Sequence, residues 1–242
     1  MRRGLVGMIG GAGALVGGLA FPLLAGLPVG AAPPPALVET PSGPAVVATG
    51  TTSPSNAGYE LPTAVTSLKG TMTVPTLTCP ATGGVQDDGS VQIDALSGGA
   101  GDFLDFGCEN GAAAYSGSVD IFGTGGTSKN IPFAMAAGDD LVTTITATAT
   151  TAKVVLTDGT KSVKISGTIS GTITNGWVEL QGSAPIVNFG TLKWTSVKVN
   201  GNSLESVAPY RYTLVNSKNK VLVSTSAVTG GTAFTNKFHA SS

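Results

Sequence analysis

Four segments of alternating apolar and polar residues each carry one carboxylate. The two-residue period of β-strands, which sends successive side chains to opposite faces, is found in segments 90–96, 103–108, 115–122 and 175–181. This period predicts one less apolar face that holds Asp94, Asp105, Asp120 and Glu179. It also puts Phe103 beside Asp105 and Trp177 beside Glu179. If the strands share a sheet, four acids and two aromatic rings face one space.

Two carboxylates in such a space can carry out hydrolysis. When they are held close together they cannot both ionise easily, so one pKa rises and the pair shares a proton. One carboxylate then activates water while its protonated partner donates to the substrate carbonyl. Asp105 and Glu179 are the candidate pair. Three other interpretations remain open: a calcium site, a glycosidase pair, or acids solvated on an exposed sheet face.

Other catalytic schemes find little support. The sequence has two cysteines and one histidine, with no CxxC or HxxxH spacing, so we predict neither a metal nor another cofactor. His239 lies near the C-terminus, which argues against a Ser-His-Asp triad. The glycine-rich stretches GGAGDF and GTGG do not lead into helices, so they are not phosphate loops. Cys79 and Cys108 are expected to form a disulfide, which would contribute about 3 kcal/mol.

The N-terminal region has the features of a targeting segment. Arg2 and Arg3 precede an apolar run that ends in the small residues VGAA. We therefore expect a cleaved signal peptide over 1–32 rather than a membrane anchor, and an exported protein with no stable membrane insertion. Residues 33–54 are rich in Pro, Ala, Thr and Ser, which predicts a disordered linker. A net charge of -1 makes nucleic acid a poor partner.

The rest of the chain is predicted to be all-β. Hydrophobic residues make up 41% of the chain and charged residues 11%, which permits one large core. Hairpin turns are expected at Asp88–Gly89, Asp158–Gly159 and Asn200–Gly201. Strands without helices between them indicate an antiparallel β-sandwich or barrel. The predicted strands are 64–78, 90–96, 103–108, 114–122, 141–149, 152–157, 161–169, 175–181, 189–199, 210–215, 219–225 and 232–238.

Several segments, in chain order, resemble motifs of the glutamic peptidases (eqolisins). SNAGY at 55–59 resembles SNWxGY, and VTSLKGTMTVP at 65–75 resembles FTSVSGTWTVP. VQID at 91–94 resembles WVGID, and FLDFGCEN at 103–110 resembles LIQxGTEQ. AGD at 137–139 resembles a PGD-containing strand, PIVNFGTLKWT at 185–195 resembles PLANFGTVTFT, and 213–234 resembles the closing strands. The resemblance therefore spans the predicted domain, 55–238.

The resemblance implies a fold and a mechanism. The fold would be two large bent antiparallel sheets, concanavalin-like, with a substrate groove on the concave face. The eqolisin Gln, which polarises the scissile carbonyl, falls on Asp105. The eqolisin Glu, which activates water, falls on Glu179 or Leu180, depending on how the motif NAEFIxE is aligned with NGWVEL. Strand alternation favours Glu179, because Leu180 shares its face with apolar Val178.

The departures from the motifs lead to two hypotheses. Asp105 replaces the Gln, and groove aromatics are lost where AWYEWYP becomes GSVDIFG at 117–123. The chain is expected to be a secreted, monomeric binding or surface module with a degenerate active site. The alternative is an acid endopeptidase that uses Asp105 and Glu179. In both cases a polypeptide is the expected ligand, in a groove lined by Asp94, Phe103, Asp120 and Trp177.

Overall fold

The computed structural model describes residues 50–81, 85–123 and 125–242. Within strand β4, only the backbone is described for residues 85, 86, 91 and 93–97. The expected signal peptide and nearly all of the expected linker lie outside the described residues. No helix in the described part of the chain is long and apolar enough to cross a membrane.

Strands form almost all of the regular structure in the described residues. In chain order they are β1 (Thr51–Ser53), β2 (Asn56–Leu61), β3 (Ser67–Thr73), β4 (Val85–Glu109), β5 (Ala112–Gly123), β6 (Thr127–Asn130), β7 (Asp140–Ala147), β8 (Thr151–Asp158), β9 (Lys161–Thr168), β10 (Ser170–Gln181), β11 (Thr191–Val199), β12 (Asn202–Ser203), β13 (Tyr210–Val215), β14 (Val221–Thr225) and β15 (Phe234–Phe238). One short 3-10 helix, η1 (Glu205–Val207), follows β12.

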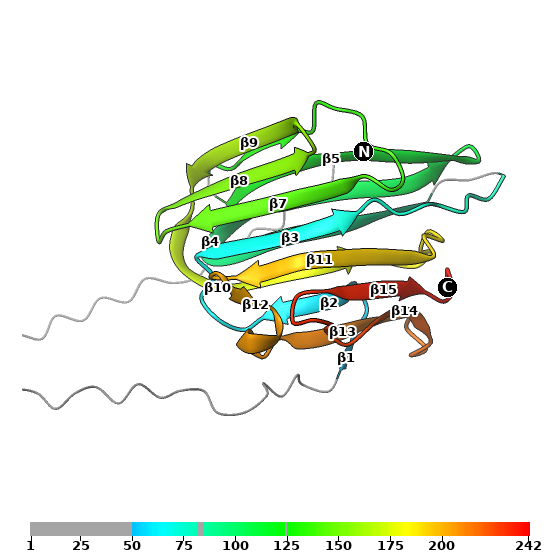
Figure 1. Ribbon diagram of the computed structural model, residues 1–242. Coiled ribbons are helices and arrows are strands. Elements are labelled where there is room, and N and C mark those ends of the chain that lie inside the picture. The colour runs from blue at the N-terminus through cyan, green and yellow to red at the C-terminus, as the bar shows by residue number, and fades with distance from the viewer. Residues whose placement is uncertain (1–49, 82–84, 124) are drawn as a thin grey trace, which may run out of the picture. The chain divides into compact units, whose positions relative to one another are not determined.

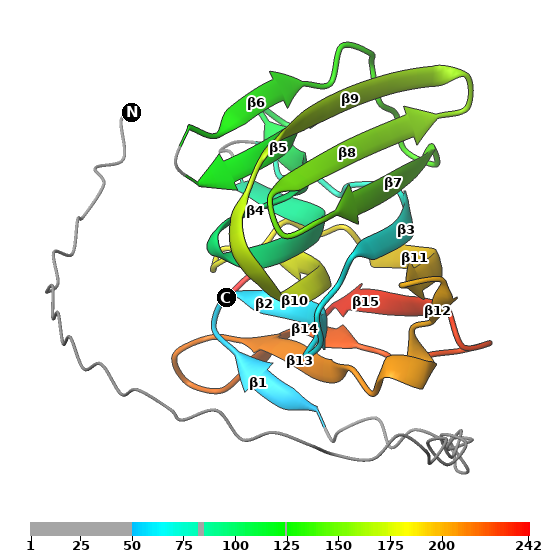
Figure 2. The same ribbon diagram turned by 90° about the vertical axis from the view of Figure 1, so that its left-hand side faces the viewer.

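The strands form one hydrogen-bonded sheet that folds over on itself. Its order is β6-β5-β4-β10-β2-β13-β14-β15-β11-β3-β7-β8-β9, and all pairings are antiparallel except that of β1 with β13. Strands β9, β8, β7, β3, β11 and β15 form the near layer in Figure 1, with β5, β4, β10 and β2 behind them. The fold brings β9 back against β5 and β6 (Figure 2). The predicted all-β, antiparallel sandwich is confirmed.

Strand β4 doubles back on itself. Its first part pairs with β10 and its second part with β5, and the Asp88 and Asp105 carboxyl groups are hydrogen-bonded to each other. A straight strand would hold these two residues far apart, because each residue advances about 3.3 Å. The doubling back therefore brings the segments 90–96 and 103–108, predicted as separate strands, to one place in the sheet.

The core lies between the two layers. Trp194 on β11 stacks on Phe234 of β15, with ring centroids 5.8 Å apart, and Tyr59 of β2 meets Phe234 edge-on at 4.8 Å. The buried indole Nε1 of Trp194 donates to Asn236 Oδ1 at 2.7 Å, so this polar group is satisfied. The core therefore ties β2, β11 and β15 together.

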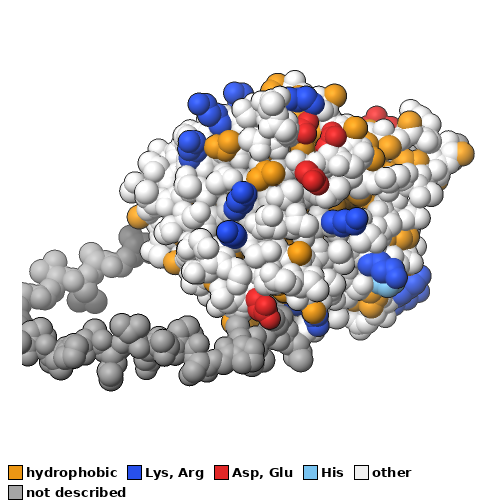
Figure 3. All heavy atoms as spheres, in the orientation of Figure 1, with side chains coloured by type: hydrophobic (Ala, Val, Ile, Leu, Met, Phe, Trp, Pro, Cys, Tyr) orange, Lys and Arg blue, Asp and Glu red, His pale blue; other side chains and the backbone are white. Residues whose placement is uncertain are grey.

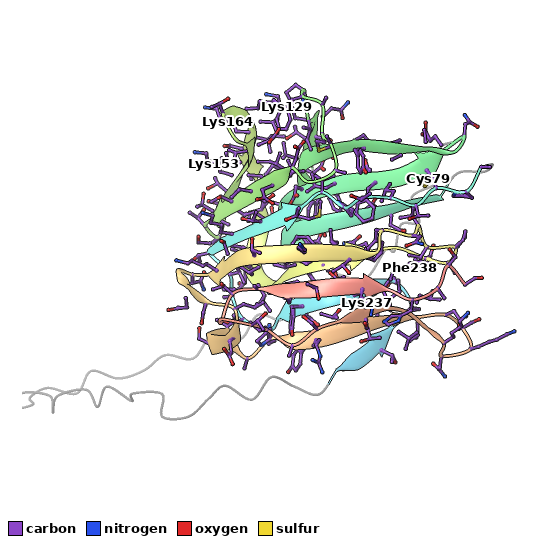
Figure 4. All side chains as sticks on the ribbon, turned by 45° about the vertical axis from the view of Figure 1, so that its right-hand side comes forward. Cys79, Lys129, Lys153, Lys164, Lys237 and Phe238 are labelled. Atoms are coloured by element: carbon purple, nitrogen blue, oxygen red, sulfur yellow. A yellow bond between two sulfur atoms is a disulfide. The ribbon has the colours of Figure 1, made fainter. Side chains whose placement is uncertain are left out.

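The disulfide expected from the sequence is present. Cys79 and Cys108 are bonded, with their Cα atoms 5.4 Å apart. Cys108 is buried near the end of β4, and Cys79 belongs to the segment that follows β3 (Figure 4). The bond thus fixes the end of β4, three residues beyond Asp105, to the chain after β3.

The strand boundaries differ from the predictions in a few places. The predicted strand 64–78 is shorter, Ser67–Thr73, while β1, β2, β6 and β12 were not predicted. The predicted hairpin at Asp88–Gly89 is wrong, because both residues lie inside β4. A Cβ atom on Gly89 would lie 2.3 Å from the Met72 sulfur, so this glycine permits close packing rather than a turn. The hairpins at Asp158–Gly159 and Asn200–Gly201 are confirmed.

Candidate functional site

One outward face of the sheet, formed by β5, β4, β10, β2 and β13, carries most of the predicted site. We call it the acidic face. Strand register assigns to it the side chains of Glu60, Asp88, Asp105, Asp120 and Glu179. The residues between them, such as Tyr59, Leu104 and Val178, point into the core. The alternation read from the sequence therefore describes 103–108, 115–122 and 175–181 correctly.

Glu179 lies at the centre of the acidic face and is enclosed. Its side chain accepts hydrogen bonds from three amides: Asn56 donates to Oε2 at 2.7 Å, and Gln92 and Gln181 donate to Oε1 at 3.2 and 2.7 Å. The residue is only 1% exposed. Burying a carboxylate is costly unless hydrogen bonds replace its hydration, and these amides supply them.

The neighbouring strand approaches Glu179 very closely. Gly58 of β2 is the register partner of Glu179, and a Cβ atom at Gly58 would lie 2.5 Å from the Glu179 Cα and 2.4 Å from the Val178 carbonyl oxygen. Its φ of 151° is also a conformation that residues with a side chain rarely adopt. A glycine is therefore required for β2 to lie against β10 here.

The amides around Glu179 were not predicted as site residues. Gln92 and Gln181 share the less apolar face of their strands with predicted site residues, so alternation contained a signal for both. Asn56 lies in the SNAGY segment, and no spacing in the sequence connects it with Glu179. Its position depends on the pairing of β2 with β10, which places Asn56 opposite Gln181.

Asp105 has different neighbours from Glu179. Its Oδ2 accepts a hydrogen bond from the Ser116 hydroxyl at 3.1 Å, and its carboxyl group is hydrogen-bonded to that of Asp88. Burial, together with the hydrogen bond and the negative charge of Asp105, raises the pKa of Asp88 to about 7. Asp88 is in turn the register partner of Gln181. The expected Asp105/Glu179 pair stays a prediction.

A second buried acid lies beneath this cluster. Asp87 points inward, is 2% exposed, and accepts the Val187 backbone N–H at 2.7 Å through Oδ2. No described residue donates a hydrogen bond to its Oδ1. Burial raises the pKa of Asp87 to about 7, although the Val187 N–H opposes the shift. The protonated form of Asp87 is thus favoured in the folded protein up to neutral pH.

Aromatic residues flank Glu179 on β10 and β13. Trp177 meets Tyr212 with ring centroids 5.6 Å apart. The Tyr212 hydroxyl donates to Glu60 Oε2 at 2.7 Å, and this bond is the main reason why the pKa of Tyr212 rises to about 12. Asn175 donates to the other oxygen of Glu60 at 3.3 Å. Trp177, predicted to line the site, therefore belongs to an ordered polar and aromatic cluster.

The remaining predicted residues lie on β4 and β5. Phe103 and Phe122 form a ring pair with centroids 6.3 Å apart, and Asp120 Oδ2 accepts a hydrogen bond from the Ser118 hydroxyl. The backbone of Asp94 is opposite Asn175 of β10, and its side chain is outside the described set. Among the described residues, no group of three or more His, Cys, Asp or Glu side chains could hold a metal ion.

The family assignment follows from a match over most of the chain. A model of the Peptidase A4 family matches residues 54–238, the region that contains every strand of the sheet described here except β1. The chain belongs to the Peptidase A4 family. No curated protein sequence matches significantly. The resemblance to glutamic peptidases read from the sequence motifs is confirmed.

Solved structures of this family have the same fold. Scytalido-glutamic peptidase with a transition state analog inhibitor is 17% identical, with a TM-score of 0.61, over 77% of this chain and 99% of that chain. SCP-B, an eqolisin-family peptidase in complex with the tripeptide Ala-Ile-His, is 16% identical, with a TM-score of 0.59 and the same coverage. Aspergilloglutamic peptidase from Aspergillus niger is 18% identical, with a TM-score of 0.51, over 64% and 99%.

This Peptidase A4 chain departs from the motifs of its family at the site. The position that the motif LIQxG assigns to Gln carries Asp105, which is bonded to Asp88 and Ser116. Leu180, the other candidate for the Glu position, is fully buried in the hydrophobic core, whereas Glu179 lies among the amides. Side-chain amides are therefore present beside Glu179, but they come from Asn56, Gln92 and Gln181.

Proposed function

We propose that this Peptidase A4 protein is an exported peptide-binding module that no longer cleaves peptides. The enclosure of Glu179 carries the proposal. A general base must have a lone pair within reach of the water that it deprotonates. Glu179 is 1% exposed, and its two oxygens accept three hydrogen bonds from side-chain amides. These bonds hold the carboxylate in a structural role at the centre of the acidic face.

Asp105 gives a second reason for lost activity. A neutral amide can donate to a developing oxyanion without first being protonated. An ionised Asp105 in the position of the Gln would repel that charge. The ligand proposed for the module is an extended polypeptide on the acidic face, because similar solved structures contain a peptide-based transition state analog or the tripeptide Ala-Ile-His. A disulfide in the domain fits an oxidising compartment outside the cytoplasm.

The alternative proposal is an active acid endopeptidase with an Asp105/Glu179 pair. The hydrogen bond between the Asp88 and Asp105 carboxyl groups favours it, because it shows acids on this face close enough to share a proton. In this scheme one carboxylate activates water while a protonated carboxyl group donates to the scissile carbonyl. The reaction would require acid pH, at which one member of the pair is protonated.

A digest of a denatured protein substrate at acid pH, from about 2 to 5, separates the two proposals. The wild type is compared with Glu179→Gln, and fragments are measured by mass spectrometry. We expect no cleavage by either protein. Cleavage by the wild type that is lost in Glu179→Gln would establish the endopeptidase and overturn the binding module. Calorimetric titration of unlabelled peptides into the wild type tests binding directly.

A further inference from the structure

We propose that a hollow on the acidic face binds a basic side chain, so that the preferred ligand is a cationic peptide. This inference rests on the proposed peptide-binding function and adds its specificity. The hollow extends over β4, β5 and the start of β6 and has a volume of about 380 Å³. Its lining residues include Phe103, Phe122, Asp120 and Ser128.

Three side chains give the hollow its chemistry. The rings of Phe103 and Phe122 are tilted by 57° to each other and supply an apolar wall. Asp120, only partly exposed, supplies a carboxylate beside them. Its Oδ2 accepts the Ser118 hydroxyl, which fixes the orientation of the group. Within the described residues, none donates a hydrogen bond to the other oxygen, so Oδ1 is available to a ligand.

This combination fits the side chain of lysine or arginine. Such a side chain has an apolar stem, which covers hydrophobic surface, and a cationic head. The stem would lie against the rings, where a cation also gains from the aromatic faces. The head would donate a charge-assisted hydrogen bond to Asp120 Oδ1. A neutral aliphatic side chain of equal length could make only the first of these contacts.

The distribution of charge over the domain supports a cationic ligand. Strand register assigns no Lys, Arg or His to the acidic face in the described parts of β2, β4, β5, β6, β10 and β13. The lysines lie elsewhere and are exposed. Many are spread over the opposite outer face (Figure 3). Lys153 and Lys164 project into solvent from β8 and β9 (Figure 4). Among the described residues, the acidic face therefore carries several carboxylates but no Lys, Arg or His side chain.

The test compares two peptides by calorimetric titration near neutral pH. Both are acetylated and amidated, about eight residues long, and identical except that one central residue is lysine or norleucine. Norleucine keeps the unbranched stem and lacks the ammonium group. For the wild type we expect the lysine peptide to bind about tenfold tighter, the gain expected from one charge-assisted contact. We expect Asp120→Asn to remove this preference, so that the two peptides bind the variant with equal affinity.

Asp140→Asn is the matched control, because it makes the same change of charge on β7, outside the acidic face. It should retain the lysine preference. Equal affinity of the wild type for both peptides would overturn this inference but leave peptide binding intact. A lysine preference that persists in Asp120→Asn would also overturn it. If neither peptide binds to the wild type, the proposed function fails, and the inference fails with it. Thermal unfolding of each variant confirms that it is folded.

Discussion

Asp88 and Asp105 occupy distant positions along strand β4, yet their carboxyl groups form a hydrogen bond. One of the two must carry a proton for this bond to form, because an ionised carboxylate is only an acceptor. Asp88 is thus an acid in contact with Asp105 that the sequence did not suggest, and burial together with this contact raises the pKa of Asp88 to about 7. Glu179 is surrounded by amides instead. Different kinds of neighbour therefore surround the two predicted catalytic residues.

The first prediction concerns Asp105→Gln, which supplies the side chain that the eqolisin motif has at this position. We expect D105Q not to cleave protein substrates at acid pH, because the three amides still enclose Glu179. Mass spectrometry of a digest measures this. Cleavage by D105Q, absent in the wild type and absent again after Glu179→Gln is added, would show that Asp105 alone prevents catalysis.

The second prediction concerns pH. The pKa of Asp87 rises from 3.8 to about 7 on folding, so between these values the folded state holds a proton that the unfolded state has lost. The resulting stability is fully present below about pH 4 and is lost as the pH rises to about 7. For Asp87 it amounts to at most about 4 kcal/mol. Asp88, which is partly exposed, adds a smaller change in the same direction.

Urea unfolding between about pH 3 and 8 measures this effect. We expect the free energy of unfolding to fall over the upper part of this range. Asp87→Asn should flatten the curve, because the amide does not titrate and keeps an oxygen for the Val187 N–H. A wild-type curve that is flat or rises from about pH 4 to 7 would contradict the raised pKa of Asp87.

The third prediction concerns Gly58→Ala. The added methyl group would lie 2.5 Å from the Glu179 Cα, so β2 and β10 would have to separate. We expect a loss of about 2–4 kcal/mol in the free energy of unfolding, from steric overlap and backbone strain together. Gly159→Ala is the control: its φ is 55° but no atom lies within 4 Å, so about 1 kcal/mol of strain is expected. Equal losses for the two variants would show that the close approach is unimportant.

Much of the fold could be predicted from local patterns. Alternation in 175–181 correctly sent Val178 and Leu180 to the core and Trp177 and Glu179 to the other face. Turn chemistry located Asp158–Gly159 and Asn200–Gly201. The same rule failed at Asp88–Gly89, because the close contact at this glycine comes from Met72, which is distant in sequence. Local turn preference cannot detect such a packing requirement.

The site was harder to predict because its contacts join distant strands. Asn56 reaches Glu179 only when β2 pairs with β10. Asp88 reaches Asp105 only when β4 doubles back. Residue type and alternation select the face on which a side chain lies, but strand order and register select its neighbours. The motif resemblance supplied the family, and the identity of the acid and amide partners required the structure.

The order of the strands also bears on self-association. A strand at the end of a sheet exposes unpaired backbone groups that can recruit another chain. The sheet ends at β6 and β9, and these two strands lie against each other. Both carry exposed lysines, Lys129 on β6 and Lys161 and Lys164 on β9. A second copy that added a strand at β6 or β9 would first have to separate these two edges. It would then bring its own edge lysines against those of the first copy. Strand addition, the commonest route to aggregation for β-rich proteins, is therefore disfavoured at both ends of the sheet.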